Sequence, residues 1–434
     1  MAGWSAQTLR EGVRRREVFA WAMYDFANSG YTTVVLTAVF NAYFVGVVAG
    51  NAPWATLAWT SCLAASCLVV MLTMPALGAY ADLRAAKKRL LATTTAGCVL
   101  ATIALAFVSR GDVAWAVVAI ILSNTFYAYG ESLIAAFLPE LAKPEALGRV
   151  SGWGWGFGYF GGMLSLGLSL AYVLWAQSQG LAAEQFVPVT MLITAGVYGA
   201  ASLVTFALLK ERATPQQAGG VAEGARAAWR RLAGTWRHAR QYKDFVWLLA
   251  CTVSYQAGIA VVIALAAVYA EQVLGFRQAQ TMLLVFLVNI ASAVGAFAFG
   301  YWQDKVGHKR ALGYTLGGWI AMALMAAAAT SAPLFWAAAV VAGLCMGSSQ
   351  SAGRAMAGLF APARHVAEFY GLWTFAVRLA AIVGPITYGL VTWWTGGNHR
   401  LAILSTAGFF VLGLALLLPV HVQRGRQAAA VTPT

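Results

Sequence analysis

The sequence predicts an all-α membrane protein with twelve transmembrane helices in two pseudo-symmetric halves of six. Of its 434 residues, 60% are hydrophobic and only 10% are charged, which leaves too little polar surface to cover a water-soluble globule. The apolar residues fall into twelve runs long enough to cross a bilayer. A short motif recurs after the second and the eighth of these runs, which indicates a tandem duplication.

The recurring motif places a glycine, an acid and a basic cluster at the end of an apolar run. Gly78 opens the first copy, and Gly300 opens the second, 222 residues further on. The acids and the first basic residues after them are Asp82, Arg84, Asp304 and Lys305. Because each copy lies between long apolar runs, the duplicated unit is a membrane-embedded half. We expect residues 1–209 and 244–434 to form the two halves, joined by a cytoplasmic linker over 210–243.

Each crossing needs about 20 apolar residues. The predicted spans cover residues 18–49, 55–80, 90–109, 113–139, 150–176, 188–209, 245–270, 280–302, 311–330, 333–361, 367–394 and 400–420. Several are longer than the hydrocarbon core requires, so we expect those helices to tilt or to extend into the interface. The first run contains Asp25 and Asn28, which a signal-peptide core would not carry, so we interpret it as a span.

Basic residues indicate the orientation. Twelve spans place both termini and every even-to-odd connection on one side of the membrane, and 24 of the 29 Lys and Arg residues fall in those segments. Only Arg110, Arg277 and Arg400 lie on the other side. The crowded side is therefore expected to be cytoplasmic. The net charge of +14 is spread over short connections, so it indicates topology and predicts no nucleic-acid partner.

The linker over 210–243 has an amphipathic pattern. Its apolar residues recur at intervals of three and four, whereas its arginines lie largely elsewhere on the turn. The residues concerned are Trp229, Leu232, Ala233 and Trp236, and Arg226, Arg230, Arg231, Arg237 and Arg240. This pattern is typical of a helix that rests on the anionic cytoplasmic surface. A plain flexible linker is the alternative.

Four ionisable side chains lie inside the predicted spans, where each costs roughly 2.5 to 3.5 kcal/mol on insertion scales. Asp25 and Glu131 belong to the first half, and Arg354 and Arg378 to the second. All four lie roughly 10 to 14 Å from the cytoplasmic ends at 1.5 Å per residue. We expect them to pair across the interface between the halves. Transporters that are built from two repeats place their substrate site at this interface. The pairs either exchange with substrate or proton, or form a permanent structural network.

Polar and aromatic residues extend the predicted substrate and proton pathway. They are Tyr24, Asn28, Tyr127, Trp155, Tyr159, Tyr255, Gln256, Asn289 and Gln350. Each could instead serve as an interhelical hydrogen bond or as packing. Gly154, Gly158 and Gly162 recur every four residues, which predicts a close approach between helices.

The proton is the expected coupling ion, because Asp25 and Glu131 are carboxylates that burial shifts toward neutrality and arginines pull back. Sodium stays open as an alternative. All five histidines lie in loops or at helix ends, and the sequence contains neither a paired metal spacing nor a His-Glu-x-x-His motif. We therefore expect no metal, no cofactor and no enzymatic activity.

The duplicated loops resemble the signature of the major facilitator superfamily. The segment from Trp21 to Tyr31, WAMYDFANSGY, resembles the first-span motif of the vacuole effluxer family, the fungal autophagy-linked vacuolar amino-acid exporters and their bacterial relatives. Similar motifs follow in order: Phe137 to Leu141, Ser151-Gly152, Gly158 to Gly162, Gln350 with Arg354, Glu368 to Gly371 and Gly384-Pro385.

This resemblance implies a twelve-helix facilitator fold and secondary active transport by alternating access, with amino-acid efflux as the family's best-known activity. It also implies a monomer in a bacterial inner membrane. Asp82 and Asp304 would each contact the end of a neighbouring helix and hold the cytoplasmic side closed, because an anion is favoured at a helix N-terminus. The alternatives are a drug or metabolite proton antiporter and, in another class, a channel or receptor-like scaffold.

Overall fold

The structure is a computed structural model, and it describes residues 8–216, 227, 230, 241–275, 278–396 and 398–430. Within these residues, twelve helical segments are long and apolar enough to span a membrane. The predicted all-α fold with twelve spans is confirmed. Most of the linker lies outside the described residues, and with it the expected interfacial helix.

The helices fall into an N-terminal group and a C-terminal group. The N-terminal group comprises α1 (Arg15–Tyr31), η1 (Thr32–Ala38), α2 (Phe40–Tyr43), η2 (Phe44–Val48), α3 (Ala55–Arg84), α4 (Lys87–Leu105), α5 (Val113–Ala135), α6 (Leu138–Leu141), η3 (Pro144–Ala146), α7 (Leu147–Ser178) and α8 (Ala183–Leu208). The C-terminal group comprises α10 (Lys243–Leu274), α11 (Gln278–Val306), α12 (His308–Ala328), α13 (Ala332–Phe360), α14 (Val366–Trp394), α15 (His399–Leu417) and α16 (Val422–Ala430).

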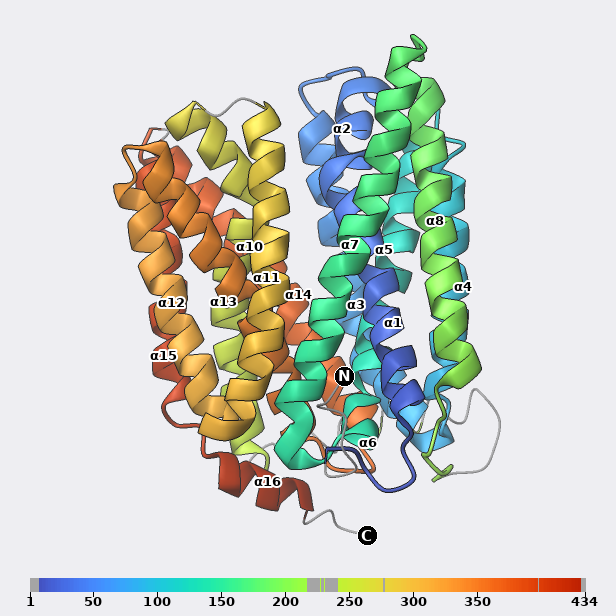
Figure 1. The fold of residues 1–434 in the computed structure, drawn as a ribbon, viewed down its shortest axis with the longest axis vertical. Coiled ribbons are helices and arrows are strands. Elements are labelled where there is room, and N and C mark those ends of the chain that lie inside the picture. Colours follow the sequence, from blue (N-terminus) through green and yellow to red (C-terminus); the bar gives the residue numbers. More distant parts are fainter. Residues whose placement is uncertain are drawn as a thin grey trace.

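The two groups stand side by side, as Figure 1 shows, and α7 and α11 face each other between them. Their ribbons come together at the lower end of the view and separate toward the upper end. The main contacts between the groups join α3 to α14, and α7 to both α11 and α13. The lower end also carries α16 and the two motif loops, and we call it the basic end.

The first span departs from a regular α-helix. After α1 the chain passes into the π-helical segment η1, and a second π-helical segment, η2, carries the span to Val48. The wider turn is visible in the hydrogen bond that Thr37 Oγ1 donates to the carbonyl of Thr32, five residues earlier, at 3.0 Å. Wide turns of this kind are rare and are frequent at functional sites. The apolar run over 18–49 predicts the span but contains no signal for them.

Glycines let α7 approach α1 closely, as their four-residue spacing predicts. A Cβ atom at Gly158 would lie 2.8 Å from Ser29 Oγ, and one at Gly162 would lie 2.9 Å from Thr33 Oγ1. At Gly161 it would lie 2.1 Å from a backbone carbonyl of α1, which no rearrangement of a side chain could relieve. Because glycine has no side chain, these positions allow the backbones of α7 and α1 to approach this closely.

The motif glycines also allow close approach between the two groups. We call the two lines of contact the seams: one joins α3 to α14, and the other joins α7 to α11. A Cβ atom at Gly78 of α3 would lie 2.2 Å from the carbonyl oxygen of Ala367 at the start of α14. A Cβ atom at Gly300 of α11 would lie 3.0 Å from its nearest neighbour, the carbonyl oxygen of Gly148 at the start of α7. At the position of the motif glycine, the α3 and α14 seam is therefore the tighter of the two.

We expect Gly78→Ala to destabilise the protein more than Gly300→Ala, although the motif treats the two positions alike. Overpacking costs about 1–3 kcal/mol, whereas the gain in helix propensity from Gly to Ala is about 1 kcal/mol. Thermal unfolding of the purified variants measures the difference. Equal melting temperatures, or a lower one for Gly300→Ala, would contradict the assignment of the tighter seam.

Candidate functional site

Asp82 joins the two groups at the basic end by capping a helix of the opposite group. It lies in the last turns of α3 and is 4% exposed. Its Oδ1 accepts a hydrogen bond from the backbone N–H of Ala367 at 3.1 Å, and its Oδ2 accepts one from Glu368 at 2.9 Å. These N–H groups open α14, where no carbonyl of the helix can accept from them and where the helix dipole favours an anion.

Asp304 makes the matching contact on the other seam. Its Oδ1 accepts from the backbone N–H of Gly148 at 3.0 Å, and its Oδ2 accepts from that of Arg149 at 3.2 Å, at the start of α7. The Arg149 guanidinium adds an ion pair at 3.3 Å. Each motif acid thus binds the N-terminus of a helix in the opposite group, a helix-end contact of the kind that the family resemblance implies.

The basic residues of the motif lie beside these contacts. Arg84 occupies the last turn of α3, and Lys305, which is exposed, occupies the last turn of α11.

The start of the predicted linker also crosses the basic end. Gln216 Nε2 donates to the carbonyl of Arg364 at 2.9 Å, and more weakly to that of Asp82 at 3.4 Å, so it touches both groups. Glu211 accepts from the backbone N–H of Lys88, at the start of α4, at 2.9 Å. Burial raises the pKa of the Glu211 carboxyl, against the opposing effect of this hydrogen bond. Residues 209–216 are therefore fixed to the basic end.

Asp25 and Arg354 form a buried ion pair between the groups. Arg354 Nη1 of α13 lies 2.7 Å from Asp25 Oδ2 of α1, and the two side chains are 4% and 10% exposed. Arg354 also donates from Nε to Ser151 Oγ at 3.1 Å, and from Nη2 to the Ser151 carbonyl at 2.8 Å. Its guanidinium lies over the rings of Trp21 and Trp155, 4.6 and 5.3 Å from their centroids. The charge is thus neutralised and enclosed.

Gly154 makes room for this pair. A Cβ atom there would lie 2.3 Å from Asp25 Oδ2 and 2.6 Å from Arg354 Nη2. Any larger residue would push the carboxylate and the guanidinium apart.

Glu131 and Arg378 form the second ion pair between the groups. Arg378 Nη2 of α14 lies 2.5 Å from Glu131 Oε2 of α5, and the side chains are 13% and 28% exposed. The Arg378 guanidinium carbon is 5.8 Å from the centroid of the Tyr127 ring, which stacks on Tyr31 at 5.2 Å. Arg378 Nε is buried and has no hydrogen-bond partner among the described residues. This pair is the more accessible of the two.

The other predicted pathway residues fall into smaller groups. Tyr198 Oη donates to Asn28 Oδ1 at 2.7 Å and lies 3.4 Å from Tyr24 Oη. Gln256 Nε2 donates to Gln350 Oε1 at 2.8 Å.

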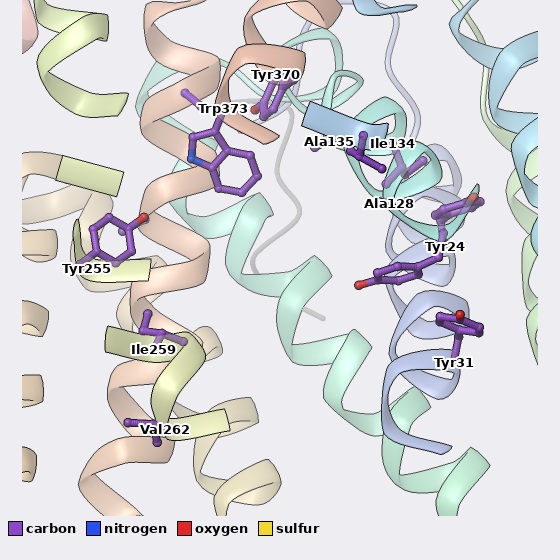
Figure 2. Packing of buried hydrophobic residues seen from close by; sticks show 14 of the residues in the cluster. Tyr24, Tyr31, Ala128, Ile134, Ala135, Tyr255, Ile259, Val262, Tyr370 and Trp373 are labelled. Carbon is purple, nitrogen blue, oxygen red and sulfur yellow. The ribbon is translucent and has the colours of Figure 1, made fainter. Parts of the chain in front are cut away.

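The remaining three predicted residues are aromatic or lie apart. Tyr159 lies next to Trp155, with ring centroids 6.1 Å apart. Tyr255 is fully buried against Gly353, the neighbour of Arg354. Figure 2 shows Tyr24 and Tyr31 of α1 on one side and Tyr255 of α10 on the other. Asn289 donates to Val285 of its own helix at 2.9 Å, so its described contact joins neither ion pair.

The sequence analysis missed several residues that surround Arg354. Ser151 Oγ accepts a hydrogen bond from the Arg354 side chain, and it donates one to the carbonyl of Ser351 at 3.0 Å. Tyr370 donates to the Arg354 carbonyl at 2.9 Å. Trp21, Ser151 and Tyr370 each lie inside a segment that resembles a family motif, and that membership is the signal that could have pointed to them. Among the described residues, no group of three His, Cys, Asp or Glu side chains could hold a metal ion.

Comparison with known proteins gives the family and the fold. The family model described as "Vacuole effluxer Atg22 like" matches residues 55–148 and 145–430. An uncharacterized MFS-type transporter of Bacillus subtilis, YxiO, is 25% identical over 410 residues, covering 92% of this chain and 93% of that protein.

Two solved structures have the same fold. The human organic anion transporter MFSD10 superposes with a TM-score of 0.71 at 15% identity, over 93% of this chain and 99% of that one. The proton:xylose symporter XylE superposes with a TM-score of 0.70 at 17% identity, over 94% and 95%.

Removing the carboxylate caps should loosen the N-termini that they bind. We expect Asp82→Ala to speed amide hydrogen exchange at Ala367 and Glu368, because both N–H groups lose their acceptor. Asp304→Ala should do the same at Gly148 and serves as the matched control, since each variant should act on its own seam. Mass spectrometry of the deuterated protein checks this. Unchanged exchange at the start of α14 in Asp82→Ala would contradict it.

The two ion pairs should differ in their effect on stability. Arg354→Ala leaves a buried carboxylate without its partner, which costs about 3–5 kcal/mol, whereas Arg378→Ala leaves the more exposed Glu131. We expect a larger fall in melting temperature for Arg354→Ala, with partial recovery in the neutral double variant Asp25→Asn/Arg354→Gln. A larger effect of Arg378→Ala would be inconsistent with the order of burial.

Proposed function

Because the chain belongs to the vacuole effluxer Atg22-like family and is an MFS-type transporter, we propose that it is a secondary active transporter that works by alternating access. Its proposed substrate is a small polar or amphipathic solute such as an amino acid, exported in exchange for protons. The relatives and the structural neighbours are transporters and not enzymes. The chain is an integral multi-pass membrane protein, and we propose the bacterial inner membrane as its location and a monomer as its functional form.

One observation carries the proposal: both ion pairs at membrane depth join an acid of the N-terminal group to an arginine of the C-terminal group. A movement of one group against the other would separate Asp25 and Glu131 from Arg354 and Arg378. Such pairs are expensive to break unless something replaces the lost partner. Substrate and protons are the natural replacements, so binding would be coupled to the movement of the proposed halves.

The two pairs suggest different roles. Glu131 and Arg378 are the more accessible, and Tyr127 lies beside them. A carboxylate and an ammonium group on one solute could take the places of the two side chains, which favours a zwitterion such as an amino acid. Asp25 and Arg354 are more deeply buried, so we assign them to the closure of the site toward the basic end.

Proton coupling follows from the same geometry. A protonated carboxyl no longer attracts the arginine as an anion does, so proton binding to Asp25 or Glu131 would release its partner. In this conformation the basic end is held closed by Asp82 and Asp304. With the basic end in the cytoplasm, as the positive-inside rule predicts, the described conformation would be the one in which the site faces outward.

A drug or metabolite proton antiporter is the second candidate. Trp155, with Tyr159 beside it, lies over the Arg354 guanidinium and offers an aromatic surface near the site. A thermal-shift screen against amino acids, peptides and cationic drugs separates the candidates, because a bound ligand stabilises the folded state by an amount that grows with the logarithm of its excess over Kd.

We expect Glu131→Gln and Asp25→Asn to abolish proton-driven transport of the solute found in that screen, because neither amide takes up a proton. Proteoliposomes with an imposed pH gradient provide the measurement. Counterflow of labelled solute at equal pH serves as the control for folding and binding, and should persist in at least the Glu131→Gln variant if the site keeps its shape.

Wild-type coupling in both variants would refute the carboxylate assignment. Saturable exchange accelerated by solute on the opposite side supports alternating access. Flux that rises linearly with concentration and shows no such acceleration would instead support a channel, and binding without any flux would support a receptor-like scaffold.

A further inference from the structure

An apolar groove runs along the seam between α7 and α11. Its volume is about 460 Å³. Its lining is apolar or aromatic and includes Phe160 of α7 and Val294, Ala298 and Tyr301 of α11. Phe160 and Val294 are 49% and 53% exposed, so the groove opens onto the outer surface of the molecule. Its α11 wall falls within a membrane span, Leu283–Val306, so the occupant at this depth is an acyl chain of the bilayer.

At the basic end, the apolar lining of the groove gives way to polar and charged groups. Tyr301 is its last lining residue, and Trp153 Nε1 donates to the Tyr301 hydroxyl at 3.1 Å. The Arg149 guanidinium lies 5.2 Å from the centroid of the Tyr301 ring. Lys305 follows Tyr301 by four residues on α11, so it lies on the same face of the helix and is exposed there. Trp and Tyr are typical of the membrane interface, where lipid head groups lie.

The charge at this end is positive. The acid nearest to Arg149 is Asp304, which is 4% exposed and already accepts from two backbone N–H groups and the Arg149 guanidinium. Arg149, which pairs with this buried carboxylate, is 28% exposed, and Lys305, the residue after Asp304, is exposed. A phosphate group at the mouth of the groove would meet both.

We propose that this groove binds one anionic phospholipid, with an acyl chain along the α7 and α11 walls and the phosphate between Arg149 and Lys305. One wall belongs to the N-terminal group and the other to the C-terminal group, so the bound lipid bridges the seam. It stabilises the conformation in which Asp304 caps α7. This site lies outside the ion-pair region and does not depend on the identity of the transported solute.

The test uses the full-length protein purified in a neutral detergent, to which phosphatidylglycerol or phosphatidylcholine with the same acyl chains is added. We expect native mass spectrometry to show one retained phosphatidylglycerol and a larger rise in melting temperature with this lipid than with phosphatidylcholine. Lys305→Gln should weaken the preference for the anionic lipid about fivefold, the effect of about one basic residue near a lipid surface. Equal stabilisation by both lipids would overturn the head-group assignment.

Val294→Trp should fill the groove and abolish the response to phosphatidylglycerol. Leu72→Trp is the matched control, because Leu72 lies 222 residues earlier, at the corresponding place on α3, and is 62% exposed. Ala298→Leu is the milder filling variant if the tryptophan prevents folding. An unchanged lipid response in a folded groove variant, or an equal loss in Leu72→Trp, would overturn the site.

Discussion

The structure depends on two aspartates that cap helices of the opposite group. Asp82 and Asp304 each accept two backbone N–H groups that have no acceptor within their own helix. The carboxylate and the helix N-terminus satisfy each other, so neither is left as an uncompensated buried group. Both contacts lie at the basic end, and they place α14 against α3 and α7 against α11 along their lengths. Because the helices are aligned in this way, Asp25 lies level with Arg354, and Glu131 with Arg378.

The duplication is preserved at the caps but not in the interior. Glu131 and Arg354 occupy corresponding positions in the two repeats, 223 residues apart, yet they have opposite charges. Each pairs with a different partner, Arg378 and Asp25 respectively. The repeat therefore provides a symmetric frame, and its substitutions place acids in one group and bases in the other. The four charges sum to zero, and each acid meets its arginine only when the two groups are in the right relative position.

Much of the fold could be predicted because membrane spans have a strong local signal. The boundaries of the twelve spans agree with the helices to within a few residues, and the helices extend further mainly where charged residues continue them beyond the apolar run, as in α3 at Arg84. The contact of the motif acids with helix ends is implied by the resemblance to the major facilitator superfamily, and it agrees with the preference of an anion for a helix N-terminus. The pairing of Asp25 with Arg354 could not, because both acids lie at similar depth and only the packing around Gly154 decides between them. The wide turns of η1 and the contacts of Ser151 likewise depend on neighbours that are distant in sequence.

The two seams have one mechanical consequence in common. A Cβ atom at Gly78 of α3 would lie 2.2 Å from a backbone carbonyl oxygen of α14, and one at Gly152 of α7 would lie 2.4 Å from the carbonyl oxygen of Ala296 on α11. Both seams therefore bring helix backbones into close contact. A rotation of one group against the other has to slide two glycine-lined surfaces at once, so a side chain added to either surface would hinder the movement.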